Sequence, residues 1–257
     1  MDRAKSFYDR EYQRDQYAPS SGVEEHSYFS NLREFIDTYR LAEKKCLEVG
    51  CGRGIFQDMV SDYTGVDLSD SVRSYFHKPF FQGSATNLPF GENTFDAIWS
   101  ITVLEHVPDP ASALLEMCRV VKPHGVIFLA PAWQCRSWAR DGYPVRPYGD
   151  FNTIGKIIKA SIIIRNSTIY RSAYIFPRRI ARLFSYLMGR RPLDLRYRKL
   201  NPNYDKYWMS DSDACCSIDP FEAILWFLSR GHLCPTYGSL LKIFFVRTGP
   251  IIFRIEK

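Results

Sequence analysis

The sequence lacks the cysteine patterns of a secreted or metal-binding protein. Its seven cysteines form no C-x-x-C pair, and none stands at metal-ligand spacing from one of the five histidines. An odd number of cysteines also fits poorly with the disulfide frameworks of secreted domains. We therefore expect reduced thiols, no bound metal and a cytoplasmic protein.

Long apolar runs are missing as well. No stretch approaches the roughly 20 apolar residues that a membrane-spanning helix requires. The first residues, MDRAK, carry charges and no apolar run follows them, so we expect no signal peptide. Internal repeats are also absent. With 257 residues, 46% of them hydrophobic, the chain is long enough for one α/β domain with additions.

Acidic residues become scarce in the second part of the chain. Residues 1–150 hold 16 Lys and Arg against 21 Asp and Glu, whereas residues 151–257 hold 18 against 7. The net charge of the two parts is therefore −5 and +11. Such asymmetry indicates an anionic partner for the second part.

Residues 45–56 combine an expected buried strand, a glycine-rich turn and the expected start of a helix. Gly50, Gly52 and Gly54 allow a tight turn and leave room for a ligand close to the backbone. A helix that begins there would direct its free N–H groups and the positive end of its dipole at a carboxylate or phosphate. The pattern therefore predicts a binding site for an anionic or polar cofactor.

The third glycine of a dinucleotide-binding turn is missing, because Ile55 occupies its position. The spacing Glu48-x-Gly50-x-Gly52-x-Gly54 instead resembles the first motif of class I S-adenosylmethionine (SAM)-dependent methyltransferases. This resemblance implies SAM as the cofactor.

Later segments resemble the further landmarks of that family, in order. Residues 63–69 indicate a second strand that ends in Asp67, and in the family such a carboxylate holds the ribose hydroxyls. Segments 88–90, 93–100 and 104–110 follow in the expected sequence. Within the family, the chain resembles the methyltransferase type 11 and ubiquinone-menaquinone methyltransferase group. It is loosely similar to bacterial cell-surface-glycan methyltransferases.

The resemblance covers roughly residues 40–133 and implies a set of cofactor contacts. Glu48 is expected near the methionine amino end of SAM and Asp67 at the ribose. Ser84 stands where many relatives carry an acid that reaches the adenine amino group. The full expected set is Glu48, Gly50, Cys51, Gly52, Asp67, Leu68, Ser84, Ala85 and Ser100.

Alternating strands and helices predict an α/β fold with a doubly wound, mostly parallel sheet of seven strands. Helices are expected over 55–62, after Ser69 and from Asp109, the last with Ala111, Leu114, Leu115, Cys118 and Val121 on one face. The last strands are expected at 232–237 and 251–255. We divide the chain into an N-terminal arm and helix (1–40), a SAM-binding core (41–133), an inserted, partly helical lid (134–217) and a C-terminal helix with the last strands (218–257).

His106 is the leading candidate for a general base, because an unperturbed imidazole titrates near ~6.5. With Glu105 it lies just beyond the carboxyl end of an expected strand, where ligands bind in such sheets. A purely structural hydrogen-bonding role for His106 is the alternative. Asp141, Tyr143 and Tyr148 of the insertion are further candidates.

The leading hypothesis is O-methylation of a sugar hydroxyl on a polysaccharide or lipid-linked glycan precursor. Two alternatives stay open. One is methylation of a small hydrophobic metabolite of the quinone or polyketide type, and the other is a SAM-binding protein without catalytic activity. We do not expect nucleic acid as the acceptor, because no Asn-Pro-Pro-Tyr-like or Pro-Cys motif occurs.

The basic insertion suggests a surface partner. Between residues 155 and 200 there are 12 Lys and Arg and one acid, Asp194. Arg178, Arg179 and Arg182 lie near the start of an amphipathic segment, and we expect them to meet an anionic membrane surface, which would make the protein peripheral on the inner face of a membrane. The alternative is a lid helix that buries its apolar stripe and leaves a solvated basic face.

Overall fold

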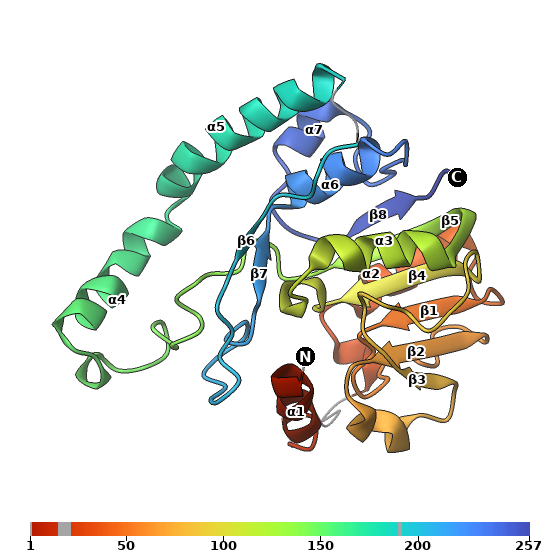
Figure 1. Ribbon diagram of the computed structural model, residues 1–257, viewed down its shortest axis with the longest axis horizontal. Helices are drawn as coiled ribbons and strands as arrows, with labels where there is room; N and C mark the ends of the chain where they lie inside the picture. Colours follow the sequence, from red (N-terminus) through yellow and green to blue (C-terminus); the bar gives the residue numbers. More distant parts are fainter. Residues whose placement is uncertain (1, 15–21, 190–191) are drawn as a thin grey trace.

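The computed structural model of the protein describes residues 2–14, 22–189 and 192–257. Within them, a sheet of six strands runs in the order β3-β2-β1-β4-β5-β8 (Figure 1). Five strands are parallel, and β8 is antiparallel to β5. The strands are β1 (Cys46–Val49), β2 (Tyr63–Asp67), β3 (Phe80–Gln82), β4 (Phe95–Ile101), β5 (Val121–Ala130) and β8 (Ile251–Arg254). The expected doubly wound α/β fold is confirmed, with six strands where we expected seven.

Helices cover both faces of this sheet, and alternate side chains of the strands separate two apolar cores. On one face, α2 (Phe29–Tyr39) packs with Ala97 and Trp99 of β4. On the other face, α3 (Pro110–Val120) and α6 (Pro220–Leu228) pack with Ile98 of β4 and Ile127 of β5. This arrangement follows from the strand period of two, which sends neighbouring side chains to opposite faces.

Two predictions about helices need correction. The segment 55–62 forms turns, with bonds such as Gln57 N–H to Gly54 O and Met59 N–H to Phe56 O. Each bond closes over three residues, so no α-helix directs its dipole at the glycine turn. After Ser69, the chain forms the 3₁₀ helix η3 (Asp70–Tyr75), and the Ser69 hydroxyl caps it as expected.

The third helix begins where the sequence indicates, with Asp109 accepting the Ser112 N–H. Its buried face, however, consists of Pro110, Ala113, Leu114, Met117 and Val120. Leu115, which we placed on that face, is 51% exposed. The helix therefore packs through a stripe rotated by about one residue from the predicted one.

The chain termini also differ from expectation. Instead of an irregular arm, the N-terminus forms α1 (Asp2–Glu11), which precedes η2 (Val23–Glu25). Residues 232–237, expected as a strand, make only an isolated bridge from Leu233 to Arg254. Pro235 has no N–H to donate, and the Thr236 hydroxyl replaces a ladder carbonyl by accepting the Ile252 N–H at 2.8 Å.

The insertion after β5 contains three parts. A loop with the short η5 (Tyr148–Asp150) leads to α4 (Thr153–Asn166) and α5 (Thr168–Leu187), which form an arm along one edge of the molecule (Figure 1). The antiparallel pair β6 (Tyr197–Lys199) and β7 (Cys216–Ile218) then returns to the carboxyl edge of the main sheet. The short helix α7 (Leu240–Phe244) lies beside α5, since the rings of Phe244 and Phe176 stack at 5.7 Å.

The arginines of α5 do not lie where we expected. Arg179 and Arg182 are 3% and 4% exposed, and they form ion pairs with Asp219 and Glu222 of the α6 region at 2.5 and 2.8 Å. Of the predicted cluster, only Arg178 is exposed. The prediction that all three arginines meet an anionic surface is therefore wrong for two of them.

Candidate functional site

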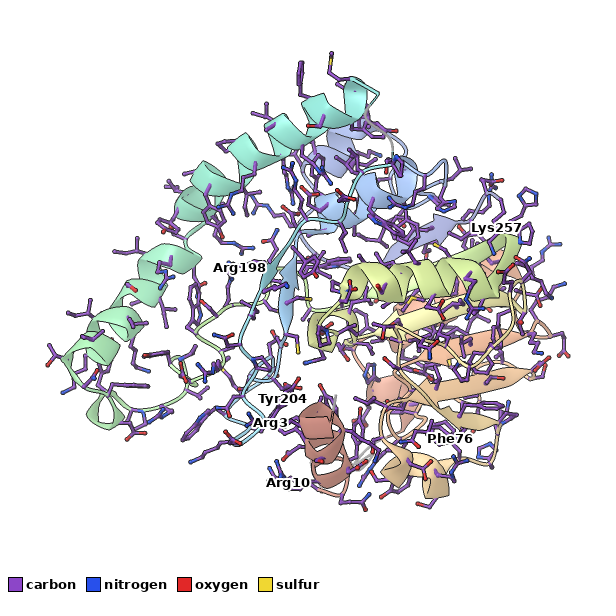
Figure 2. The ribbon with its side chains drawn as sticks, viewed as in Figure 1. Arg3, Arg10, Phe76, Arg198, Tyr204 and Lys257 are labelled. Carbon is purple, nitrogen blue, oxygen red and sulfur yellow. The ribbon has the colours of Figure 1, made fainter. Side chains whose placement is uncertain are left out.

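A cavity of about 1230 Å³ opens at the carboxyl edge of the parallel strands. Its walls come from the glycine turn after β1, the end of β2, the 3₁₀ helix η4 (Leu104–His106), α1 and the loop between β6 and β7. Figure 2 shows Arg3 and Tyr204 close together where α1 meets that loop, and both line the cavity. Small-molecule sites commonly have volumes of roughly 300–1,000 Å³, so this cavity has room for a donor and an acceptor together.

The glycine turn has the left-handed backbone that its sequence predicts. Gly50, Gly52 and Gly54 have φ values of +76°, +48° and +72°. A Cβ at Gly50 would lie 2.2 Å from Cγ2 of Val103, so the turn also needs glycine for packing. The Gly50 N–H donates to the Val66 carbonyl at 2.8 Å, which fixes the turn against the end of β2.

Asp67 is buried at the end of β2 and faces the turn. Its Oδ2 accepts the Gly52 N–H at 2.9 Å and lies 3.4 Å from the Tyr12 hydroxyl, while Oδ1 accepts the Ser69 N–H at 2.9 Å. Burial raises the pKa of Asp67, and these donors oppose that rise. A carboxylate offers about four acceptor positions, so hydroxyl groups of a ligand can still bind to it.

Glu48, on β1, also lines the cavity. It is 3% exposed, and the Tyr63 hydroxyl donates to its Oε2 at 2.5 Å. Burial raises the pKa of Glu48 to about 8, which favours its protonated form. A ligand ammonium group beside it would favour the ionised form.

Most of the other predicted cofactor contacts lie in the same cavity. Its walls include the residues Cys51, Leu68, Ser84 and Ala85. The Ser84 hydroxyl is 2.9 Å from the Thr86 hydroxyl, so a hydroxyl pair stands where many relatives carry an acid. Ser100 is buried and does not line the cavity.

His106 lies on the cavity wall in a buried charged network. Its Nδ1 is 3.1 Å from Oδ2 of Asp213, and the same oxygen accepts the Tyr8 hydroxyl at 2.7 Å. Burial by itself would lower the pKa of His106, but Asp213, Glu105 and Asp211 outweigh burial and raise it to about 9. His106 is therefore mostly protonated at neutral pH, which corrects the expected value near ~6.5.

Glu105 lies beside His106 with one oxygen unsatisfied. Its Oε1 accepts the Ala132 N–H at 2.9 Å and is 3.8 Å from Nε2 of His106. Its Oε2 is buried and has no hydrogen-bond partner among the described residues. Burial raises the pKa of Glu105, because an unpaired buried carboxylate oxygen is costly.

Asp211 and Asp213 were not among the candidates that the sequence suggested. The β6–β7 unit brings both aspartates to the site, because the Cys215 N–H donates to the Glu105 carbonyl at 2.7 Å. A signal was present, since Asp211 and Asp213 are two of only seven acids after residue 150. Two acids so close together in a basic segment could have been singled out.

The remaining candidates from the insertion lie elsewhere. Asp141, Tyr143 and Tyr148 do not line the cavity, and the ring of Tyr143 stacks on that of Phe151 at 4.6 Å. No group of His, Cys, Asp and Glu suited to a metal ion occurs in the part of the chain that the structure describes. Likewise, no helix built from those residues is long and apolar enough to cross a membrane.

The residues around the cavity fit SAM. Asp67 can accept from ribose hydroxyls and Glu48 from the methionine ammonium group. Gly52 leaves the backbone open, because a Cβ there would have no neighbour closer than 3.8 Å. Leu68 and Ala85 add apolar surface to the same cavity.

Comparisons with known proteins agree with this fit. Residues 47–129 match a family model described as a methyltransferase domain. The chain is 26% identical over 197 residues to the ubiquinone biosynthesis O-methyltransferase of Albidiferax ferrireducens, a match that covers 66% of this chain and 69% of the relative. With the corresponding protein of Dechloromonas aromatica it shares 34% identity over 107 residues, 35% of this chain and 45% of the relative. The chain thus spans less than half of that second relative.

Solved structures give partial matches. YcgJ from Bacillus subtilis is 28% identical with a TM-score of 0.37, covering 41% of this chain and 51% of that one. SAM-bound CalS10, an amino pentose methyltransferase from Micromonospora echinaspora, is 20% identical with a TM-score of 0.40, covering 48% and 56%. The assignment rests on the matched domain, the curated relatives and the geometry of the glycine turn and Asp67. Residues 47–129 therefore form a methyltransferase domain, and the glycine turn and Asp67 within it suit SAM as the cofactor.

Proposed function

We propose that this methyltransferase methylates a hydroxyl oxygen of a ring-bearing acceptor that binds beside His106. The observation that carries the proposal is the network of Tyr8, Asp213, His106 and Glu105 on the wall of the cavity that also contains the glycine turn. SAM supplies an activated methyl group to such a site. The protein's part is to align the acceptor, exclude water and accept the hydroxyl proton.

The network suits proton removal from a phenolic hydroxyl. Asp213 contacts Nδ1 of His106 and leaves Nε2 as the position that takes up a proton. As the methyl group bonds to the acceptor oxygen, the hydroxyl proton passes to Nε2. A phenol titrates near ~10, close to the pKa of about 9 of His106, so this transfer needs little driving force.

A quinone-type precursor with a phenolic hydroxyl is therefore the acceptor that we favour. The curated relatives carry the name ubiquinone biosynthesis O-methyltransferase, and the rings of Tyr8, Tyr204 and Tyr207 give the cavity aromatic surface. A sugar hydroxyl, our first expectation, is the second candidate. Asp211, Ser210 and Lys199 favour it, because they give the cavity several hydrogen-bonding groups. An aliphatic hydroxyl, however, holds its proton more tightly than a phenol.

The acceptor can be tested directly with methyl-labelled SAM. We expect label to pass to a dihydroxybenzene that carries an apolar chain, and little label to pass to free or nucleotide-linked sugars at the same concentration. Preferential labelling of the sugars would select the second candidate. If neither probe is labelled and fractionated cell extract also takes up none, while SAM still binds, the protein is a SAM-binding protein without methyltransferase activity.

Asp67→Ala is expected to weaken SAM binding by about ten- to a hundredfold. The change removes a buried acceptor for two ribose hydroxyls, which corresponds to roughly 1.5–3 kcal/mol. Isothermal titration calorimetry measures the effect, with Asp70→Ala as the matched control, because Asp70 is only partly buried, pairs with Arg73 and does not line the cavity. Equal affinity in both variants, or tight binding of NADH, would contradict the assignment of this cofactor site.

A further inference from the structure

Helix α5 buries two arginines beside Leu183 and Tyr186, which pack against the core, and it leaves an apolar stripe outward. The buried residues of α5 are Arg179 and Arg182. On the opposite side, Ile180, Phe184 and Leu187 are 59%, 63% and 62% exposed. This is the reverse of an ordinary surface helix, which buries its apolar stripe and exposes its charges.

The exposed apolar surface continues beyond these three residues. Ile169, near the start of α5, is 84% exposed, and Met188 at its end is 64% exposed. Spacings of three and four residues from 169 through 173, 177, 180, 184 and 187 place the stripe on one side of the helix. The exposed residues of this stripe are Ile169, Ala173, Pro177, Ile180, Phe184 and Leu187, none of which carries a charge.

Neighbouring helices also expose large apolar side chains. On α7 and just after it, Leu241 and Phe245 are 70% and 54% exposed, and the Phe245 ring contacts that of Phe176 on α5 at 5.7 Å. On α4, Ile157 and Ile164 are 65% and 66% exposed. We call the exposed apolar residues of α4, α5 and α7 the apolar arm, and Figure 1 shows α4 and α5 along the edge of the molecule, away from the main sheet. Soluble monomers rarely leave so many large apolar side chains uncovered in one region.

Exposed basic residues accompany the apolar arm. Lys156 of α4, Arg178 of α5 and Lys242 of α7 are exposed, as are Arg196 and Arg247 in the adjoining segments. Between residues 155 and 200, one acid stands against 12 Lys and Arg. Even with two arginines paired to Asp219 and Glu222, the region keeps a strong positive charge.

We infer that the apolar arm docks onto the surface of an anionic lipid bilayer. Uncovered Ile, Leu and Phe side chains can enter the boundary between headgroups and acyl chains, and the neighbouring Lys and Arg can meet anionic headgroups. Charge decides against a second copy of the chain as the occupant, because pairing through this face would bring two strongly basic surfaces together. The inference concerns the surface outside the SAM cavity and does not depend on which acceptor is methylated.

The test is flotation of the whole chain with two kinds of vesicle. One contains phosphatidylcholine alone, and the other contains about 30% phosphatidylglycerol to supply anionic headgroups. We expect the protein to float with the anionic vesicles at low salt, and binding to weaken as salt screens the headgroups. Phe184→Glu should weaken binding at least about tenfold, since it replaces a large exposed apolar side chain by an acid. Leu115→Glu is the matched control, because Leu115 is similarly exposed but lies on α3.

Each outcome decides the inference. Loss of flotation in Phe184→Glu, with normal SAM affinity and normal flotation of Leu115→Glu, supports it. The inference is overturned if the wild-type protein floats with neither kind of vesicle. It is also overturned if Phe184→Glu and Leu115→Glu lose vesicle binding equally. The wild type could instead form concentration-dependent dimers that dissociate in Phe184→Glu, and bind no vesicles. That result would identify a second copy of the chain as the occupant and would also overturn the inference. If Phe184→Glu does not fold, Ile180→Glu gives the same comparison.

Discussion

His106→Ala should lower the rate of methyl transfer by about two to four decades while SAM affinity hardly changes. The reason is positional. His106 lies at the Glu105 and Asp213 side of the cavity, whereas the glycine turn and Asp67 form the cofactor side. Turnover measured with saturating SAM, together with calorimetry of SAM binding, separates the two effects.

The same hypothesis fixes the direction of the pH dependence. A base must be neutral to accept a proton, and a group with a pKa of about 9 is neutral in about one molecule in a hundred at pH 7. The rate should therefore rise about tenfold per pH unit and level off only near pH 9. Asp213→Asn removes the largest influence that raises this pKa, so the plateau should begin at lower pH.

A purely structural histidine would behave differently. His106→Ala would then lose stability or SAM affinity along with activity, and the pH profile of the wild type would show no step near pH 9. Asp141→Ala serves as a second control, because Asp141 does not line the cavity and should keep nearly full activity. Unchanged turnover in His106→Ala would transfer the role of base to Glu105.

Local signals predicted the glycine turn and the strand that ends in Asp67. The glycine spacing fixes a left-handed turn, and a strand that ends in Asp67 runs parallel to the strand before that turn. Both features depend on residues within about 20 positions of one another. The helix expected over 55–62 failed because apolar spacing alone does not distinguish a helix from successive tight turns in a short segment.

The acceptor side depends on contacts that no local pattern contains. Tyr8 and Asp213 are 205 residues apart and meet only because α1 and the β6–β7 unit both reach the carboxyl edge of the sheet. The orientation of α5 has the same origin. Periodicity located its apolar stripe, but the carboxylates of Asp219 and Glu222, 40 residues further along, determine which side faces inward.

Arg179→Ala is expected to destabilise the fold by about 3–5 kcal/mol, the cost of leaving one partner of a buried ion pair unpaired. The Arg179 guanidinium donates to both oxygens of Asp219 and to the carbonyls of Phe244 and Val246. Its removal leaves the two carbonyls without this donor and leaves Asp219 with the Phe221 N–H, and it releases α5 from both α6 and α7. Urea unfolding followed by circular dichroism measures the loss.

Arg178→Ala is the matched control for this prediction. Arg178 is the next residue along the helix and its side chain is exposed, so the substitution should change the free energy of unfolding by no more than about 0.5 kcal/mol. Comparing Arg179→Ala with Arg178→Ala also distinguishes the role of Arg179 in holding α5 from a direct contact of basic side chains with lipid. If Arg179 holds α5 in its inverted orientation, Arg179→Ala should lower vesicle binding together with stability, because the apolar stripe is no longer presented outward. Arg178→Ala should leave stability intact and lower vesicle binding only slightly, through the loss of one charge. Equal, small effects of both substitutions on stability would mean that apolar packing, rather than the ion pair with Asp219, fixes the orientation of the helix.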